Sequence, residues 1–370
     1  MRLKDNIIFI LSPESWGISF VSKHHYAVEL AKLGNQVFFI NPPNQNAKNA
    51  IQDIPEYPGL KVVDYQSRFR GLNRLPAFLR NLLNNLEAKR ILKLCGLKPD
   101  IFWSFDPFRF QNFKGFGAKL NIYHPVDPHQ TKLERICAAN SDIIFTVSHK
   151  ILDTLKGYGR LSFQVNHGLA PHFLEHPDSI ATKLDNSSVH VGYVGNLNYA
   201  LLDIEILETI IKSNPEVQFH FIGPYKKNNL SNAEGHLSFW EKMLKEKNVK
   251  LYGPVPSSEL PALINQFDLF LMCYKTNINP LTVSNSHKIL EYLSTGKIVI
   301  SHFVDEYKDK SDLIKMATNN TDLPVLFSKT LTELETLNSS RLQKIRQDFA
   351  KANTYPKQLE RIENILEEHV

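Results

Sequence analysis

The chain has 370 residues, of which 42% are hydrophobic and 22% are charged, with a formal net charge of +5. This length suits two ordinary domains, and the composition excludes a disordered or low-complexity protein. Its three cysteines, Cys95, Cys137 and Cys273, are far apart and odd in number, which argues against a disulfide framework or a structural zinc site.

The apolar runs are too short for membrane insertion. The first, residues 7–11, follows Arg2 and Lys4 and is shorter than a signal-peptide core. No later run approaches the roughly 20 apolar residues of a spanning helix. We therefore expect a cytoplasmic protein, with any membrane contact peripheral and on the inner face.

Short apolar runs alternate with helical patterns along the first half. These runs do not alternate strictly between apolar and polar, which is typical of strands buried on both faces of a parallel sheet. A helix is expected over 20–33, closing at Gly34. The expected strands are 7–11, 36–40, 100–105, 119–123 and 142–147.

A basic, amphipathic helix is expected within residues 70–94. Residues 1–176 carry 22 Lys/Arg against 14 Asp/Glu, and much of this excess falls between Lys61 and Lys98. Apolar side chains recur there at helical spacing: Leu75, Phe78, Leu79, Leu82, Leu83 and Leu86. Such a helix suits peripheral contact with an anionic membrane. The alternative is a solvated basic face whose leucines pack on the core. Basic and aromatic residues do not interleave elsewhere, so we expect no nucleic-acid binding.

The alternation of apolar runs and helical patterns starts again after a polar stretch. We expect an N-terminal domain over 1–176, a linker over 177–188 and a second domain over 189–352, followed by a C-terminal helix over 353–370 that returns to the first domain. Strands are expected at 190–194, 217–222, 249–252, 268–273 and 298–301, and helices at 203–212, 237–246, 259–266, 288–294, 339–352 and 356–368. This alternation predicts an α/β protein of two doubly wound, Rossmann-like parallel sheets, with ligands at the carboxyl ends of the strands.

Dehydrogenase and metal-dependent chemistry are disfavoured. The dinucleotide fingerprint G-x-G-x-x-G is absent, and the nearest motif is Gly195-Asn196 after a strand. This glycine either lets backbone amides approach a phosphate or simply forms a tight strand-to-loop turn. The sequence contains no Asp-x-Asp pair to hold Mg²⁺ or Mn²⁺. We expect no metal and no cofactor, with helix N-termini and cations meeting the charge of a diphosphate.

The stretch from Asn248 to Ser301 carries a resemblance to a known family. It contains Gly253-Pro-Val255, a short helix, an apolar strand and Lys288-Ile-Leu-Glu291-Tyr-Leu-Ser-Thr-Gly296. This pattern resembles the donor domain of GT-B glycosyltransferases, most closely the retaining family four. Phe219-His-Phe-Ile-Gly223 and Val165-Asn-His-Gly168 are similar to other segments of that family. The resemblance implies a GT-B fold and a nucleotide-sugar donor, with UDP or GDP favoured.

The resemblance gives the site residues their expected roles. Ser286 is placed to cap a helix whose first turn holds His287 and Lys288, where free amides and an ammonium favour a diphosphate. Glu291 lies one turn on and is expected to accept hydrogen bonds from the ribose diol. The alternative is an exposed Lys288–Glu291 ion pair of little energy. The remaining expected donor contacts are Gly17, Gly195, Asn196, Asn198, Gly223 and Val255.

Two departures from the family pattern concern the donor. Val283 stands where the family usually has a first glutamate, so backbone amides near Val283 and Ser284 are expected to meet the sugar. Asn198 and Asp203 replace the family's Arg and Lys pair, and Lys226 or Lys227 would supply the cation instead.

Candidate reaction residues lie in the first domain. The loop after the first strand has Trp16 before a lone Gly17. His124, at a strand end, matches a histidine that relatives place near the reacting sugar, and packing within a loop is its alternative role. Together with Asp127, it is expected to orient sugar or acceptor, without acting as a general base.

The sequence thus predicts a metal-independent, hexosyltransferase-type glycosyltransferase. It would transfer a sugar, with retention, to a hydroxyl of a saccharide or lipid-linked acceptor in surface polysaccharide or glycoconjugate synthesis. The alternatives are an inactive nucleotide-sugar-binding or scaffold protein of the same fold and a sugar-nucleotide epimerase.

Overall fold

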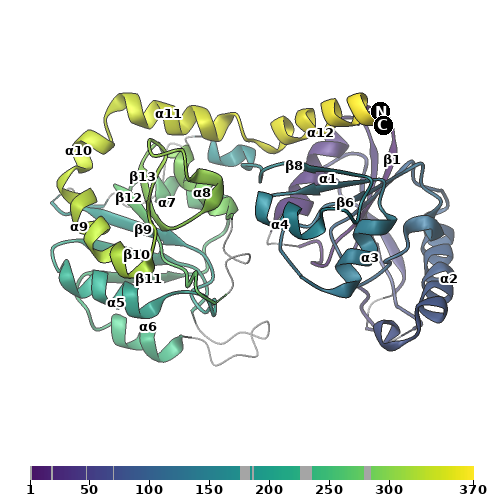
Figure 1. The fold of residues 1–370 in the computed structure, drawn as a ribbon, viewed down its shortest axis with the longest axis horizontal. Coiled ribbons are helices and arrows are strands. Elements are labelled where there is room, and N and C mark those ends of the chain that lie inside the picture. Colours follow the sequence, from purple (N-terminus) through teal and green to yellow (C-terminus); the bar gives the residue numbers. More distant parts are fainter. Residues whose placement is uncertain are drawn as a thin grey trace. The chain divides into compact units, whose positions relative to one another are not determined.

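The chain folds into two compact units (Figure 1). The computed structural model describes residues 2–17, 20–46, 48–69, 71–175, 184–185, 187–225, 236–278 and 285–370. Unit 1 comprises Met1–Gly168 and Tyr355–Val370, and unit 2 comprises Leu169–Thr354. The chain therefore passes between the units at 168/169 and at 354/355, whereas the sequence places domain ends at 176 and 352. Most of the expected linker, 177–183 and 186, lies outside the described residues.

Unit 1 is built on an eight-stranded sheet in the order β3-β4-β2-β1-β5-β6-β7-β8. All neighbouring strands are parallel except the edge strand β3, which is antiparallel to β4. The strands are β1 Ile7–Leu11, β2 Gln36–Ile40, β3 Ala50–Asp53, β4 Leu60–Asp64, β5 Ile101–Ser104, β6 Leu120–Tyr123, β7 Ile143–Thr146 and β8 Leu161–Gln164. The sequence analysis missed β3, β4 and β8.

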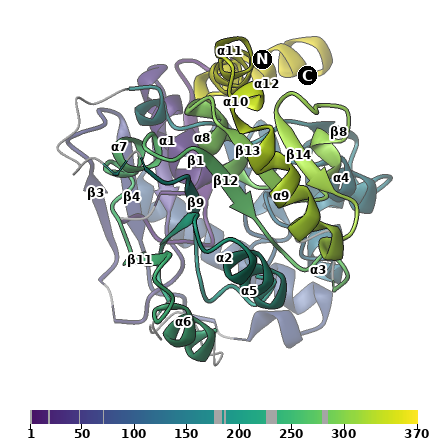
Figure 2. The same cartoon turned by 90° about the vertical axis from the view of Figure 1, so that its left-hand side faces the viewer.

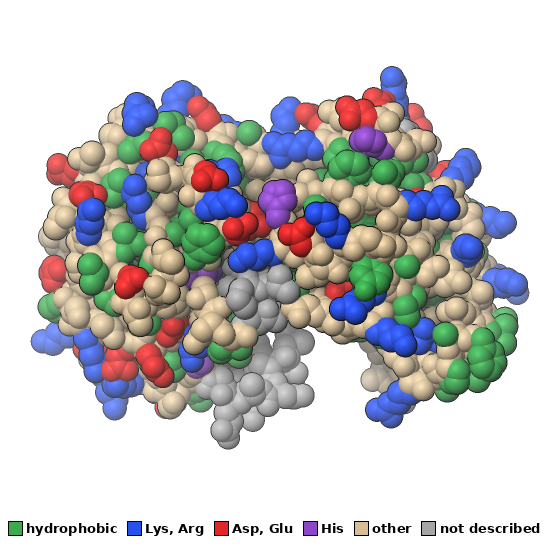
Figure 3. All heavy atoms as spheres, viewed as in Figure 1, with side chains coloured by type: hydrophobic (Ala, Val, Ile, Leu, Met, Phe, Trp, Pro, Cys, Tyr) green, Lys and Arg blue, Asp and Glu red, His purple; other side chains and the backbone are tan. Residues whose placement is uncertain are grey.

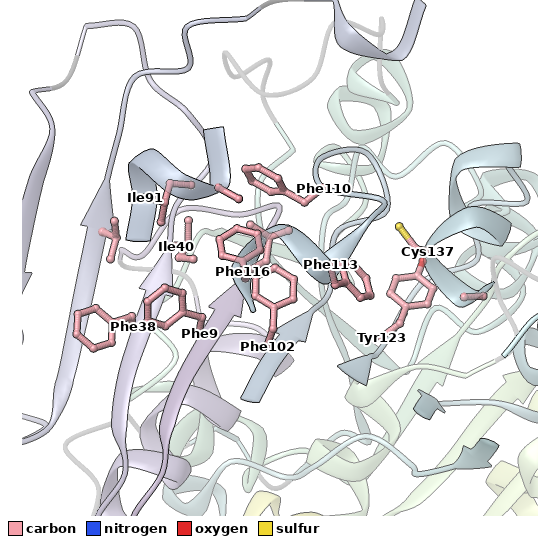
Figure 4. Packing of buried hydrophobic residues seen from close by; sticks show 14 of the residues in the cluster. Phe9, Phe38, Ile40, Ile91, Phe102, Phe110, Phe113, Phe116, Tyr123 and Cys137 are labelled. Atoms are coloured by element: carbon pink, nitrogen blue, oxygen red, sulfur yellow. The ribbon is translucent and has the colours of Figure 1, made fainter. Parts of the chain in front are cut away.

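Aromatic side chains fill the core of unit 1. Figure 4 shows Phe9 and Phe102 from neighbouring strands lying next to Phe116. The rings of Phe102 and Phe116 stack with centroids 4.2 Å apart. The helices of this unit are α1 Ser22–Lys32, α2 Ala77–Cys95, α3 Lys132–Asn140, α4 His149–Leu155 and α12 Tyr355–His369, with short 3-10 turns η1 Leu72–Arg74 and η2 Phe113–Phe116.

Helix α12 is part of unit 1 although it ends the chain. The Tyr355 hydroxyl donates to Ser22 Oγ at 3.2 Å, and its ring stacks on His25 with centroids 4.7 Å apart. A Cβ on Gly168 would fall 2.4 Å from the Tyr355 ring. Only glycine therefore allows the chain to leave unit 1 beneath this tyrosine.

Unit 2 has a six-stranded, wholly parallel sheet in the order β11-β10-β9-β12-β13-β14 (Figure 2). Its strands are β9 His190–Val194, β10 Gln218–Ile222, β11 Val249–Gly253, β12 Leu269–Met272, β13 Ile298–His302 and β14 Ile314–Ala317. Its helices are α5 Ile204–Ser213, α6 Leu237–Met243, α7 Leu260–Ile264, α8 His287–Ser294, α9 Leu323–Thr332, α10 Leu334–Leu337 and α11 Ser340–Lys351, with 3-10 turns η3 Pro171–Phe173, η4 Asp305–Tyr307 and η5 Asn320–Asp322.

The expected fold class is confirmed. Each unit is an α/β structure whose sheet is wound in both directions from its first strand, β1 in unit 1 and β9 in unit 2. No helix in the described part of the chain combines the length and the hydropathy needed to cross a membrane.

Candidate functional site

The strand order of unit 2 defines where a ligand would bind. From β9 the chain winds outward to β10 and β11, and then returns to place β12 on the other side of β9. Open α/β sheets bind ligands beyond the carboxyl ends of the strands at such a reversal. Helix α8, which connects β12 to β13, contacts the end of β9 there, as its hydrogen bonds show.

Tyr292 fixes α8 to the end of β9. Its hydroxyl accepts a hydrogen bond from the Val194 amide at 2.8 Å and donates to the Val194 carbonyl at 3.2 Å. Its ring stacks on Phe270 of β12, with centroids 4.2 Å apart and planes inclined by 4°. The first turn of α8 is thereby held beside the loop that follows β9. Sequence analysis did not single out Tyr292, because its position in the motif carries no charge.

Gly195 and Gly223 allow two backbone segments to meet at this edge. Gly223 has φ +137, and a Cβ there would lie 1.8 Å from the Gly195 carbonyl oxygen. A Cβ on Gly195 would lie 2.6 Å from Cε of Lys288. The Gly195 amide donates to the Ile222 carbonyl at 2.8 Å, so this glycine provides space rather than a free donor. The absent side chain leaves room for the Lys288 stem against the strand end.

The first two turns of α8 carry a lysine, a histidine and a largely buried carboxyl. The Glu291 side chain is 18% exposed, and its Oε1 lies 3.7 Å from His287 Nε2. Burial raises the pKa of Glu291 to about 7, and the charge of Lys288 opposes that rise. Glu291 thus lies closest to His287 among the ionisable side chains of α8, and it is largely buried rather than part of the exposed Lys288–Glu291 pair weighed from the sequence.

Ser286 occupies the N-cap position of α8, with extended backbone angles of φ −128 and ψ 130, but its side chain makes no capping hydrogen bond. The neighbouring expected contacts, Val283 and Ser284, and the alternative cations Lys226 and Lys227 lie outside the described residues.

The other donor residues predicted in unit 2 lie at the same sheet edge. Asn196 is exposed after β9, and its side-chain oxygen accepts from the Asn198 amide at 3.0 Å. Val255 is half-buried after β11. Asp203 is buried at the N-cap of α5, where it accepts from the Ile206 amide at 3.5 Å and from Asn320 at 2.8 Å. Asp203, which stands where the family pattern has a basic residue, thus caps a helix.

In unit 1, the loop after β1 is tied to β2. The Trp16 amide donates to Asn41 Oδ1 at 2.8 Å, and its ring packs on Phe39. A Cβ on Gly17 would meet nothing within 4 Å, so no described contact requires glycine there.

His124 is completely buried after β6. Trp103 Nε1 donates to His124 Nδ1 at 3.3 Å, which leaves the proton on Nε2, and Nε2 has no hydrogen-bond partner among the described residues. The rings of Tyr26 and Phe105 lie against it, with centroids 5.3 and 5.0 Å away. Burial lowers its pKa to about 3, so the ring is neutral and its free N–H is an uncharged donor. Asp127 is exposed, and no described contact joins it to His124.

The structure adds Arg109, which sequence analysis missed. Its guanidinium donates to Asp106 at 2.5 Å, to the Asn41 carbonyl at 2.8 Å, to the Tyr65 hydroxyl at 3.3 Å and to the Ser12 carbonyl. These partners follow β5, β2, β4 and β1 respectively, so one side chain joins four strand ends. The one feature of the sequence that could have indicated Arg109 is the opposite charge of Asp106 three residues earlier.

Beside Arg109 lies a pocket of about 440 Å³. It is lined by aromatic rings, amides and charged groups, including Tyr65, Asn73, Asn84, Glu87, Phe108 and Arg109. Glu87 is 2% exposed, with Oε2 accepting from Arg90 at 2.9 Å, while Oε1 accepts no hydrogen bond within the described part of unit 1. Ring faces and fixed amide and carboxyl groups suit a polyhydroxylated ligand.

Among solved structures, the chain resembles several glycosyltransferases. Sucrose-phosphate synthase from Thermosynechococcus elongatus is 12% identical, with 98% of each chain covered and a TM-score of 0.69. Trehalose 6-phosphate synthase from Burkholderia multivorans is 12% identical, with 97% of each covered and a TM-score of 0.65. Anabaena HepE, in complex with UDP and glucose, is 14% identical, covers 98% of this chain and 99% of its own, and has a TM-score of 0.66.

The sequence itself matches no family model and no curated protein. At such low identity the structural likeness concerns the fold. It extends over nearly the whole of each chain and includes both parallel-sheet units. The chain therefore has the GT-B fold of these glycosyltransferases.

Proposed function

We propose that the chain is a glycosyltransferase that binds a nucleotide sugar in unit 2 and transfers the sugar to an acceptor hydroxyl held by unit 1. The observation that carries this proposal is the attachment of α8 to β9. Tyr292 fixes the helix, Lys288 lies against Gly195, and Glu291 is held largely out of water one turn on. A scaffold role alone would require none of these three features.

The donor is proposed to bind through its diphosphate and its ribose. The first turn of α8 has no side-chain cap, and an uncapped helix start attracts anions through its amides and dipole. Lys288 adds an ammonium at the same end. Glu291 then accepts two hydrogen bonds from the ribose diol. A uridine or guanosine donor remains our expectation.

Transfer is proposed to rely on positioning and on stabilisation of the leaving diphosphate. His124 offers an uncharged N–H that would orient the sugar or acceptor, and Asp127 remains a candidate for the same task. Metal independence rests on the absence of an Asp-x-Asp pair in the sequence. Retention follows from the family resemblance. The acceptor is a saccharide or lipid-linked saccharide, for which the pocket beside Arg109 supplies suitable chemistry, and surface polysaccharide or glycoconjugate synthesis is the proposed setting.

Calorimetry with UDP, GDP and ADP tests the donor site. Glu291→Ala removes an acceptor of charge-assisted hydrogen bonds and should weaken binding of the preferred nucleotide by about tenfold or more. Glu216→Ala, at an exposed position of the same unit, is the matched control and should bind as the wild type does. Equal binding by Glu291→Ala and wild type would overturn the proposal.

The same nucleotide sugars separate the alternatives. Transfer or slow hydrolysis excludes an inactive binding protein, and conversion of the donor sugar without an acceptor would indicate an epimerase.

A further inference from the structure

The first half of helix α2 exposes large apolar side chains and buries polar ones. Phe78 is 70% exposed and Leu82 55% exposed, and Leu79 and Leu86 are also exposed. The buried residues of α2 include the polar Arg80, Asn84 and Glu87, whereas the second half of the helix joins the core through Ala88, Ile91 and Cys95. Figure 3 shows hydrophobic side chains gathered at the edge of the molecule where Figure 1 draws α2. These four exposed side chains thus do not pack on the core, and large exposed apolar patches mark interaction surfaces.

The same face becomes cationic toward the end of the helix. Phe78, Leu82 and Leu86 are four residues apart, and Lys89 and Lys93 continue that row at helical spacing. Both lysines are exposed. Glu87 is the one carboxylate in the sequence between Gly71 and Lys98, and it is buried. The exposed face therefore joins apolar side chains to positive charge without a countercharge of its own.

We propose that this face of α2 seats unit 1 on an anionic lipid surface. Phe78, Leu82 and Leu86 enter the boundary between headgroups and acyl chains, and the lysines contact lipid phosphates. The docking does not depend on the transfer reaction proposed above.

Pairing with a second copy fits this face less well. Antiparallel pairing of two α2 helices would set Lys89 and Lys93 of one copy against the apolar row of the other and remove their charges from water. Parallel pairing would bring like charges together. A bilayer surface instead places the apolar row among acyl chains and the lysines among charged headgroups.

The pocket beside Arg109 opens beside the start of this helix. Leu72, Asn73 and Arg74, which line the pocket, immediately precede α2 in the chain. Resting on the proposed function, we infer that the acceptor is lipid-linked, with its saccharide in the pocket and its lipid in the bilayer against which α2 lies.

Co-sedimentation with lipid vesicles tests the docking. The wild-type protein should bind vesicles of phosphatidylcholine with phosphatidylglycerol more tightly than phosphatidylcholine alone, and salt should weaken the binding. Phe78→Ser with Leu82→Ser should weaken binding to the mixed vesicles by about tenfold or more. Lys89→Glu with Lys93→Glu should cause a similar loss on mixed vesicles only. Val325→Ser is the matched control, because Val325 is 73% exposed on unit 2, and it should bind as wild type.

The thermal midpoint and nucleotide binding are measured on each variant. Loss of vesicle binding with both properties unchanged supports the docking, and the lysine pair carries the test if the serine pair does not fold. Absence of wild-type binding to mixed vesicles, or wild-type binding by both pairs, overturns it. A wild-type dimer that the serine pair dissociates, without vesicle binding, would instead identify an interface between copies. Nucleotide binding reports separately on the proposed donor site.

Discussion

The hydroxyl of Tyr292 in α8 both accepts from the amide and donates to the carbonyl of Val194, the last residue of β9. The second turn of the helix and the strand end are thereby linked through one oxygen atom. The position of Lys288 beside Gly195 depends on this link.

Tyr292→Phe removes only that oxygen, because the ring stack on Phe270 remains possible. We expect the free energy of unfolding to fall by about 1–2 kcal/mol, since the Val194 amide loses its partner. Nucleotide affinity should fall as well, because α8 is no longer fixed. Denaturant unfolding and calorimetry measure the two effects. Tyr158→Phe, on an exposed ring of unit 1, should change neither.

Glu291 should make donor affinity depend on pH. Its pKa is about 7 in the empty site, and the ribose diol needs an ionised acceptor. Binding below pH 7 therefore releases a proton, so affinity should rise with pH up to about 7 and then level off. Calorimetry of nucleotide-sugar binding in buffers of different ionisation enthalpy measures the number of protons released. In Glu291→Gln the affinity should be lower and independent of pH, and a similar pH dependence in this variant would contradict the assignment.

The same carboxyl should destabilise the empty protein at high pH. The folded-state pKa of about 7 exceeds the ordinary value of 4.5, so the folded state binds more protons between these values and stability falls as pH rises through them. The loss amounts to roughly 3 kcal/mol at 1.36 kcal/mol per pKa unit. Glu291→Gln should therefore raise the thermal midpoint at pH 8 and have little effect at pH 4. A lower midpoint at pH 8 would show that the carboxylate is stabilised by the fold.

His124→Phe separates packing from participation in the reaction. The site is surrounded by aromatic rings, so stability should change by less than about 1.5 kcal/mol, while the Trp103 N–H loses its acceptor. Donor binding in unit 2 should be unaffected, and transfer should fall by about tenfold or more if Nε2–H contacts the reacting sugar. Full transfer activity would indicate a packing role. Because the folded-state pKa of about 3 lies below 6.5, the wild-type histidine costs stability as pH falls between these values, and the variant should lose less stability in acid.

Arg109→Lys tests the junction of strand ends in unit 1. Lysine cannot reproduce a planar fork that reaches Asp106, Asn41 and Tyr65 together. The expected loss is about 2–4 kcal/mol, because buried acceptors are left unpaired. Denaturant unfolding measures it, and Arg135→Lys on α3 is the control, expected to cost well under 1 kcal/mol.

The sequence predicted the strands nearest the centre of each sheet well, and it missed β3, β4 and β8 towards the edges of the first sheet. The ranges expected for β1, β2 and β9 agree with the structure, because their continuous apolar runs need cover on both faces. Strand β3, Ala-Ile-Gln-Asp, is mostly exposed at the sheet edge. It is a strand because of its backbone pairing with β4 and not because its residues favour one. Propensity alone cannot identify such a strand.

The positions of the candidate donor residues were predictable where charged residues and glycines mark them. Lys288, Glu291 and the glycines after β9 and β10 lie at one sheet edge, as the motif spacing indicates. For Arg109 the sequence offered only its spacing from Asp106, because its other partners are backbone carbonyls and side chains that only the fold assembles. The first half of α2 departs from the usual rule that an apolar stripe faces inward, because Phe78, Leu82 and Leu86 are exposed there.

The chain leaves unit 1 after Gly168 and re-enters it at Tyr355, so unit 2 is an uninterrupted insertion between two pieces of unit 1. A single cut cannot separate the units into two whole folding modules. Residues 169–354 form a continuous segment suited to separate expression, whereas unit 1 needs its last helix supplied, in trans or through a short artificial connection from 168 to 355. Any truncation that removes Tyr355 would therefore damage the unit that begins the chain, hundreds of residues away in sequence.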